Sequence, residues 1–86
     1  MTWLYALATV FGMLMGAANL PQAIKIFRRK SAKDIHPMTY IILVIGSLIW
    51  IAYGVEIRSV PVIVSNISGF IFLSMVMIGW LAYGRN

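Results

Sequence analysis

Residues 18–22 read Ala18-Asn19-Leu20-Pro21-Gln22 and interrupt an apolar segment that is otherwise typical of a membrane-spanning helix. Proline has no backbone N–H and its ring crowds the preceding turn, so a helix bends or breaks at such a position. Asn19 and Gln22 flank the proline where lipid favours apolar side chains. The stretch predicts a hinge at Pro21 and Gln22, and a static kink is the alternative.

The composition around this stretch predicts a membrane protein. Of the 86 residues, 62% are hydrophobic and 10% are charged, and the mean hydropathy of +0.92 lies outside the range of soluble domains. Three apolar stretches, at about residues 3–27, 37–54 and 60–84, can each cross a hydrocarbon core of ~30 Å at ~1.5 Å per residue. We therefore expect an all-α membrane protein in which residues 1–86 form a single three-helix transmembrane domain.

Basic residues predict how the spans are oriented. Five of the seven lie around the first loop, namely Lys25, Arg28, Arg29, Lys30 and Lys33. Because positive charge accumulates on the cytoplasmic side, we expect the N-terminus outside and the C-terminus in the cytoplasm. A basic loop beside a span is typical of a topology signal or a contact with anionic lipid, so we expect the lipid membrane, and no nucleic acid, as a partner.

Several kinds of chemistry are absent from the sequence. It has no cysteine, no cluster of metal ligands and no nucleophile beside a plausible base, so we expect no enzyme activity, no metal and no cofactor. Both acids, Asp34 and Glu56, lie at the ends of predicted helices. A proton or sodium relay has no obvious carrier, which favours uncoupled transport of a neutral solute.

Small, polar and aromatic residues gather on one side of the second predicted span, at Thr39, Gly46, Ser47, Trp50, Tyr53 and Gly54. The third span carries a small, polar cluster of Ser65, Asn66, Ser68 and Gly69. Counted from the outer ends of their spans, Trp50 and Asn66 lie at a similar depth and can line one pocket. An indole packs on the C–H face of a sugar, and an amide hydrogen-bonds to hydroxyls.

We take Trp50 and Asn66 as the main substrate-binding candidates, with Ser47 and Asn19 as further ones. Alternatives from the residues alone are interhelical hydrogen bonding by Asn66 and packing or interfacial anchoring by Trp50. The motif Gly12-Met13-Leu14-Met15-Gly16 predicts close contact with another helix. Three helices of ~10 Å diameter fill their own interior, so a transport path requires an oligomer.

The sequence resembles the PQ-loop family and, within it, the bacterial SemiSWEETs, half-size relatives of the SWEET (MtN3/saliva) sugar transporters. The resemblance covers essentially the whole chain. It rests on Asn19-Leu20-Pro21-Gln22, Arg28-Arg29-Lys30-Ser31, Met38-Thr39-Tyr40, Trp50-Ile51-Ala52-Tyr53-Gly54 and Asn66.

This resemblance implies a multi-pass protein of the bacterial inner membrane that forms a parallel homodimer, a 3+3 six-helix bundle with one central site. The third span is expected to lie between the other two. Trp50 and Asn66 map onto residues that contact sugar, and Pro21 onto a flexing point of the first helix. Tyr53, Arg58 and Glu56 are expected at an outer gate, and position alone suggests Met38 and Ile42 for an inner gate.

Together these observations predict facilitative transport of a small neutral sugar, a mono- or disaccharide of the glucose or sucrose class, by alternating access. A PQ-loop carrier of another metabolite, such as an amino acid, is the nearest alternative. A small membrane subunit that does not transport is the alternative from a different class.

Overall fold

The apolar segments form helices in a computed structural model that describes residues 2–33 and 35–83. In chain order the helices are α1 (Trp3–Ala17), α2 (Leu20–Arg29), α3 (Pro37–Glu56) and α4 (Val60–Tyr83). Within the described residues three spans are long and apolar enough to cross a membrane: α1 and α2 together, α3, and α4. The expectation of an all-helical membrane protein with three spans is confirmed.

The first span breaks in the turn that precedes Pro21. After α1, the N–H groups of Ala18 and Asn19 each donate to the carbonyl three residues back, at 3.3 Å, which makes a tight turn. The Asn19 side-chain amide also donates to the Gly16 carbonyl, at 3.2 Å. Pro21 lies in the first turn of α2, and because it has no N–H, the Ala17 carbonyl lacks the partner that it would have in a continuous helix. The break therefore lies at Ala18 and Asn19.

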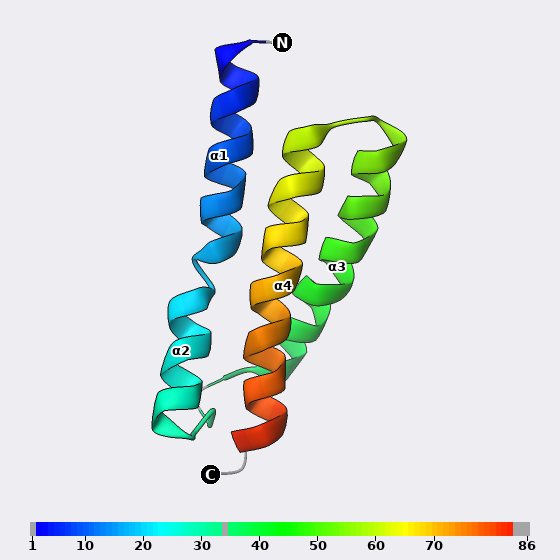
Figure 1. Ribbon diagram of the computed structural model, residues 1–86. Helices are drawn as coiled ribbons and strands as arrows, with labels where there is room; N and C mark the ends of the chain where they lie inside the picture. The colour runs from blue at the N-terminus through cyan, green and yellow to red at the C-terminus, as the bar shows by residue number, and fades with distance from the viewer. Residues whose placement is uncertain (1, 34, 84–86) are drawn as a thin grey trace.

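Helix α4 lies between the other spans. It packs against α1, α2 and α3, and Figure 1 shows it in the middle of the molecule. This arrangement agrees with the helix order that the resemblance implied. The Cα atoms extend over 48 × 21 × 13 Å, so the chain is elongated and flattened.

Small residues bring α1 and α4 into close contact. A Cβ atom added to Gly12 would lie 2.5 Å from the Cβ of Ser65. One added to Gly16 would lie 2.5 Å from the backbone nitrogen of Gly69. Both distances are shorter than van der Waals contact, so neither position has room for a side chain. The close helix contact expected from the Gly12–Gly16 motif is confirmed.

A small apolar core holds α2 against the end of α4. A Cβ atom added to Gly79 would lie 2.7 Å from the Cγ2 atom of Ile26, so Ile26 fills the space that this glycine leaves. The rings of Phe27 and Tyr83 meet edge to face, with centroids 5.8 Å apart. The buried hydrophobic residues of this core are Ala23, Ile26, Ala32, Ile35 and Val76. The two halves of the first span thus pack on different parts of α4.

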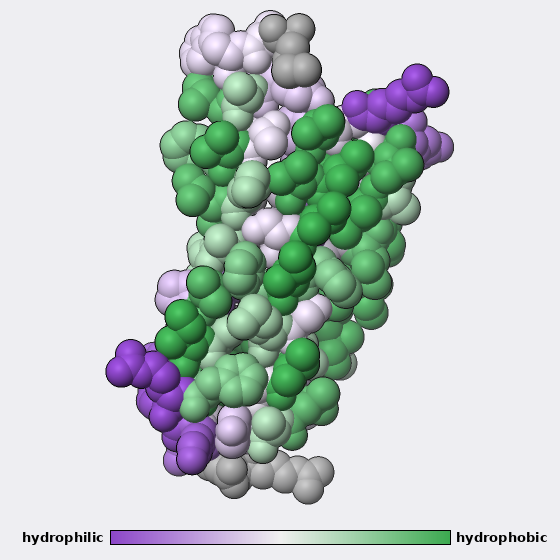
Figure 2. All heavy atoms as spheres, viewed as in Figure 1, coloured by the Kyte–Doolittle hydropathy of each residue, from purple (hydrophilic) through white to green (hydrophobic). Residues whose placement is uncertain are grey.

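Most large apolar side chains point outward. Figure 2 shows hydrophobic side chains over the middle of the visible face, while hydrophilic ones gather at the end of α2 and at the turn between α3 and α4. An apolar belt between two polar ends is the pattern that a bilayer requires. The outside of the chain is therefore built to face lipid or another membrane helix.

Candidate functional site

Helix α3 has one face toward α4 and two flanks. Ser47 and Gly54 are buried on the face toward α4, where a Cβ atom on Gly54 would lie 2.9 Å from Ile63. On one flank, Ile41 and Ile45 line a groove together with Ser74, Met77 and Ile78 of α4. At ~100° per residue, Trp50 lies on the opposite flank. The candidate sugar-binding residue is therefore turned away from this apolar groove.

Trp50 and Tyr53 form an aromatic pair on that flank. Their ring centroids are 5.6 Å apart and the rings are nearly perpendicular, at 86°. Trp50 keeps 52% of its surface exposed and Tyr53 keeps 46%. The structure thus brings together a residue expected to bind substrate and a residue expected at the outer gate, and a large part of both rings is open to contact.

Asn66 lies on α4 at the level of Trp50. Because α3 and α4 are antiparallel, a step forward along α3 corresponds in depth to a step backward along α4. A Cβ atom on Gly69 would lie 3.9 Å from the hydroxyl oxygen of Ser47, so these two residues share a level. Trp50 is three residues after Ser47 and Asn66 is three residues before Gly69, which places the two candidates at one depth. The Asn66 amide, partly buried, donates to the Val62 carbonyl at 2.8 Å.

Two further candidates use their polar groups inside the chain. The Ser47 hydroxyl, on a residue only 7% exposed, donates to the Leu43 carbonyl at 2.8 Å. Asn19 lies at the break in the first span, and its amide donates to the Gly16 carbonyl. A role for Ser47 and Asn19 in binding substrate remains a prediction.

The predicted gate residues occupy opposite ends of α3. Glu56 is the last residue of α3, and Arg58 follows in the turn with a left-handed backbone, φ 54°. Met38 and Ile42 lie one turn apart near the start of α3, 57% and 61% exposed. By helical spacing they face away from α4. At the predicted hinge, Pro21 is exposed and Gln22 is partly buried, both in the first turn of α2.

The small, polar cluster on α4 divides between its two neighbours. Asn66 lies at the level of Trp50 on α3, whereas Ser65 and Gly69 face the glycines of α1. The Ser68 hydroxyl donates to the Met13 carbonyl of α1 at 2.9 Å. Most of the cluster therefore serves helix packing, which sequence spacing did not distinguish from a pocket.

One hydrogen bond between helices was not predictable from the sequence. The backbone N–H of Val60, at the start of α4, donates to the Tyr5 hydroxyl of α1 at 3.1 Å. A tyrosine near a membrane interface is usually interpreted as an interfacial anchor, so its sequence position did not predict this hydrogen bond.

Among the described residues, no group of three or more His, Cys, Asp or Glu side chains is placed to hold a metal ion.

Comparison with known proteins gives consistent matches. A curated sugar transporter SemiSWEET of Bradyrhizobium diazoefficiens is 31% identical over 67 residues, 78% of either chain. A sugar transporter SemiSWEET of Leptospira biflexa is 27% identical over 76 residues, 88% of this chain and 89% of the relative. The crystal structure of a bacterial homologue of SWEET transporters superposes with a TM-score of 0.89 at 31% identity, covering 96% of this chain and 100% of that one.

The model of the family described as "Sugar efflux transporter for intercellular exchange" matches residues 2–86. That match covers nearly the whole chain. The curated relatives agree with it over 78% and 89% of their length, and the solved structure agrees with it in fold. Since the named relatives are transporters, the expectation that the chain is not an enzyme is confirmed. The chain belongs to this family of sugar transporters, whose bacterial members include the SemiSWEETs.

Proposed function

We propose that this protein carries a small neutral sugar, of the glucose or sucrose class, across the bacterial inner membrane by facilitated diffusion. The observation that carries the proposal is the placement of Trp50, with half of its surface open, at the level of Asn66 on the neighbouring helix. An indole face and an amide at one depth offer a sugar both an apolar C–H contact and hydrogen bonds.

The transporting unit is a parallel homodimer in this proposal. Three helices of ~10 Å diameter fill their own interior, so one chain encloses no path by itself. On the flank and far face of α3, four side chains keep 46–61% of their surface exposed, namely Trp50, Tyr53, Met38 and Ile42. A second copy in the same orientation supplies the opposite wall and repeats Trp50 and Asn66 across one central cavity.

In this proposal the protein works by alternating access between an outer and an inner gate. Tyr53, Glu56 and Arg58 close the outer end, and Met38 and Ile42 close the inner end, with the sugar site between them along α3. The break before Pro21 lets the inner half of the first span change its angle. Sugar shifts the populations of open and occluded states only as far as it contacts the occluded state better.

Transport is uncoupled in this proposal, because the two acids of the sequence, Asp34 and Glu56, lie outside the middle of the spans. The distribution of basic residues favours an external N-terminus and a cytoplasmic C-terminus. A carrier of another metabolite such as an amino acid remains the alternative substrate class. A non-transporting membrane subunit is disfavoured by membership of a transporter family.

Uptake into liposomes tests the proposal. The purified protein, reconstituted alone, is expected to equilibrate labelled glucose or sucrose without accumulation, and an imposed pH gradient is expected to change nothing. Accumulation driven by the gradient would contradict the uncoupled mechanism. Uptake of labelled amino acids but of neither sugar would support the alternative substrate, and no uptake by a well-folded dimer would overturn the transport proposal.

A further inference from the structure

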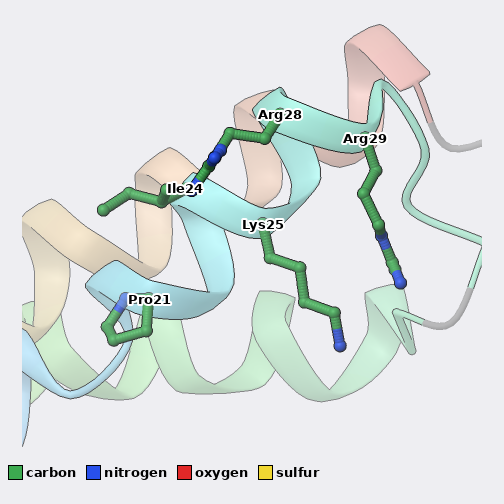
Figure 3. A pocket seen from close by; sticks show the side chains of 5 residues that line it. All are labelled: Pro21, Ile24, Lys25, Arg28 and Arg29. Carbon is green, nitrogen blue, oxygen red and sulfur yellow. The ribbon is translucent and has the colours of Figure 1, made fainter.

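The face of α2 that points away from α4 carries a hollow of its own. It measures about 550 Å³ and is lined by Pro21, Ile24, Lys25, Arg28 and Arg29. These residues lie opposite Ala23 and Ile26, which are fully buried on the α4 side. Figure 3 shows Lys25 and Arg29 extending on the same side of α2, while the Arg28 side chain runs along the helix toward Ile24. The hollow is separate from the level of Trp50 and Asn66.

The lining changes from apolar to cationic along the helix axis. Pro21 and Ile24 lie at the start of α2, within the span, and Lys25, Arg28 and Arg29 follow over the next turns. At ~1.5 Å per residue, Lys25 is ~6 Å closer than Pro21 to the end of the span. Long basic side chains bury their stems in the apolar region and place their charges at the lipid headgroups. A matching ligand has an apolar chain and an anionic head.

We propose that this hollow binds an anionic phospholipid, with an acyl chain along Pro21 and Ile24 and the headgroup phosphate at the basic part of the lining, to which Lys25 and Arg28 contribute. Charge complementarity supports this occupant, because the sequence has seven basic residues against two acidic ones. Glu56 lies at the far end of α3 and Asp34 lies outside the described residues. Each Lys or Arg near the surface adds to the attraction for anionic lipid.

A topology signal alone does not account for the arrangement. Orientation depends on how many basic residues flank a span, and the side of the helix on which they lie does not enter. Lys30 and Lys33 contribute to that count but do not line the hollow. Lys25 and Arg28 instead share one helix face with two apolar residues, as a site for an amphiphile requires. Substitution of Lys25 and Arg28 can therefore be compared with substitution of Lys30 and Lys33 as a matched control.

Native mass spectrometry of the delipidated protein provides the measurement. Phosphatidylglycerol is titrated against phosphatidylcholine with the same acyl chains, for the unaltered chain, for Lys25→Gln/Arg28→Gln and for the control Lys30→Gln/Lys33→Gln. We expect phosphatidylglycerol to bind more tightly than phosphatidylcholine, the first variant to lose about tenfold in affinity for it, and the control to lose much less. Equal binding of both lipids, or equal losses in both variants, would overturn the proposal.

Two further measurements distinguish the lipid from other occupants of the hollow. If inorganic phosphate competes as well as the lipid does, a headgroup alone suffices and the proposed apolar contact is wrong. If Lys25→Gln/Arg28→Gln changes the ratio of monomer to dimer and leaves lipid binding unchanged, a second copy of the chain covers this face and the lipid proposal fails. Sugar uptake is not part of the readout, so this proposal and the proposed function fail independently.

Discussion

Gly16 on α1 and Gly69 on α4 meet backbone to backbone, so that a Cβ atom on Gly16 would lie 2.5 Å from the Gly69 nitrogen. Gly16→Ala forces the helices apart, and we expect it to cost about 1–3 kcal/mol of stability, as overpacked sites do. The melting temperature in detergent is the measurement. Gly46→Ala is the matched control, since nothing lies within 4 Å of a Cβ atom there. Equal melting temperatures for the two variants would contradict this packing.

Trp50→Ala is expected to abolish sugar binding and uptake while the chain still folds. The ring packs against Tyr53 but is 52% exposed, so its loss leaves little buried cavity. Binding by calorimetry, uptake into liposomes and the melting temperature are measured together. Trp3→Ala, which removes a tryptophan that is 72% exposed on α1, is expected to keep both binding and uptake. Loss of folding in the Trp50 variant would favour a packing role instead.

Asn66→Leu and Ser68→Ala separate the two functions of the polar cluster on α4. Asn66→Leu keeps the side-chain size but removes the amide, and we expect sugar affinity to fall at least tenfold, which corresponds to ~1.4 kcal/mol. Ser68→Ala removes the hydrogen bond to Met13, and we expect a loss of ~1 kcal/mol in stability with sugar affinity retained. The opposite pattern would place the site on the α1 side of α4.

The sequence predicted the elements of this fold better than their contacts. Apolar length gave the three spans, and the spacing of Gly12 and Gly16 gave the close helix contact, because both depend on local properties of one segment. The common depth of Trp50 and Asn66 was also predictable, since it requires only counting from the ends of antiparallel helices.

Helical spacing did not predict the role of a side chain where that role depends on which neighbouring helix the side chain contacts. Ser65, Ser68 and Asn66 look alike on a helical wheel, but the glycines of α1 take the first two into a packing interface. The break, by contrast, lies where proline chemistry places it, because the ring of Pro21 crowds the preceding turn, which holds Ala18 and Asn19.

Tyr5→Phe is expected to weaken the junction between the outer ends of α1 and α4. The Tyr5 hydroxyl accepts a hydrogen bond from the Val60 N–H, one of the unpaired donors at the start of a helix. We expect a loss of ~0.5–1.5 kcal/mol, seen as a lower melting temperature, and faster exchange of the Val60 amide hydrogen. An unchanged exchange rate at Val60 would show that the Tyr5 hydroxyl does not protect this amide, which would contradict the contact.

Pro21→Ala is expected to stop transport without unfolding the protein. Alanine restores an N–H that can bond to the Ala17 carbonyl, which favours one continuous helix across the break. The two halves of the first span can then no longer change their relative angle, although α1 stays packed through its glycines and α2 through Ile26. Uptake is measured beside the melting temperature and the dimer fraction.

Pro61→Ala is the control for that variant, because Pro61 lies in the first turn of α4, where no helix continues before it. Its uptake is expected to match that of the unaltered chain. If Pro21→Ala also transports at the normal rate from a stable dimer, the break is a static kink and the gates must open by another movement. If it transports slowly yet binds sugar with unchanged affinity, the break acts on the conformational change itself.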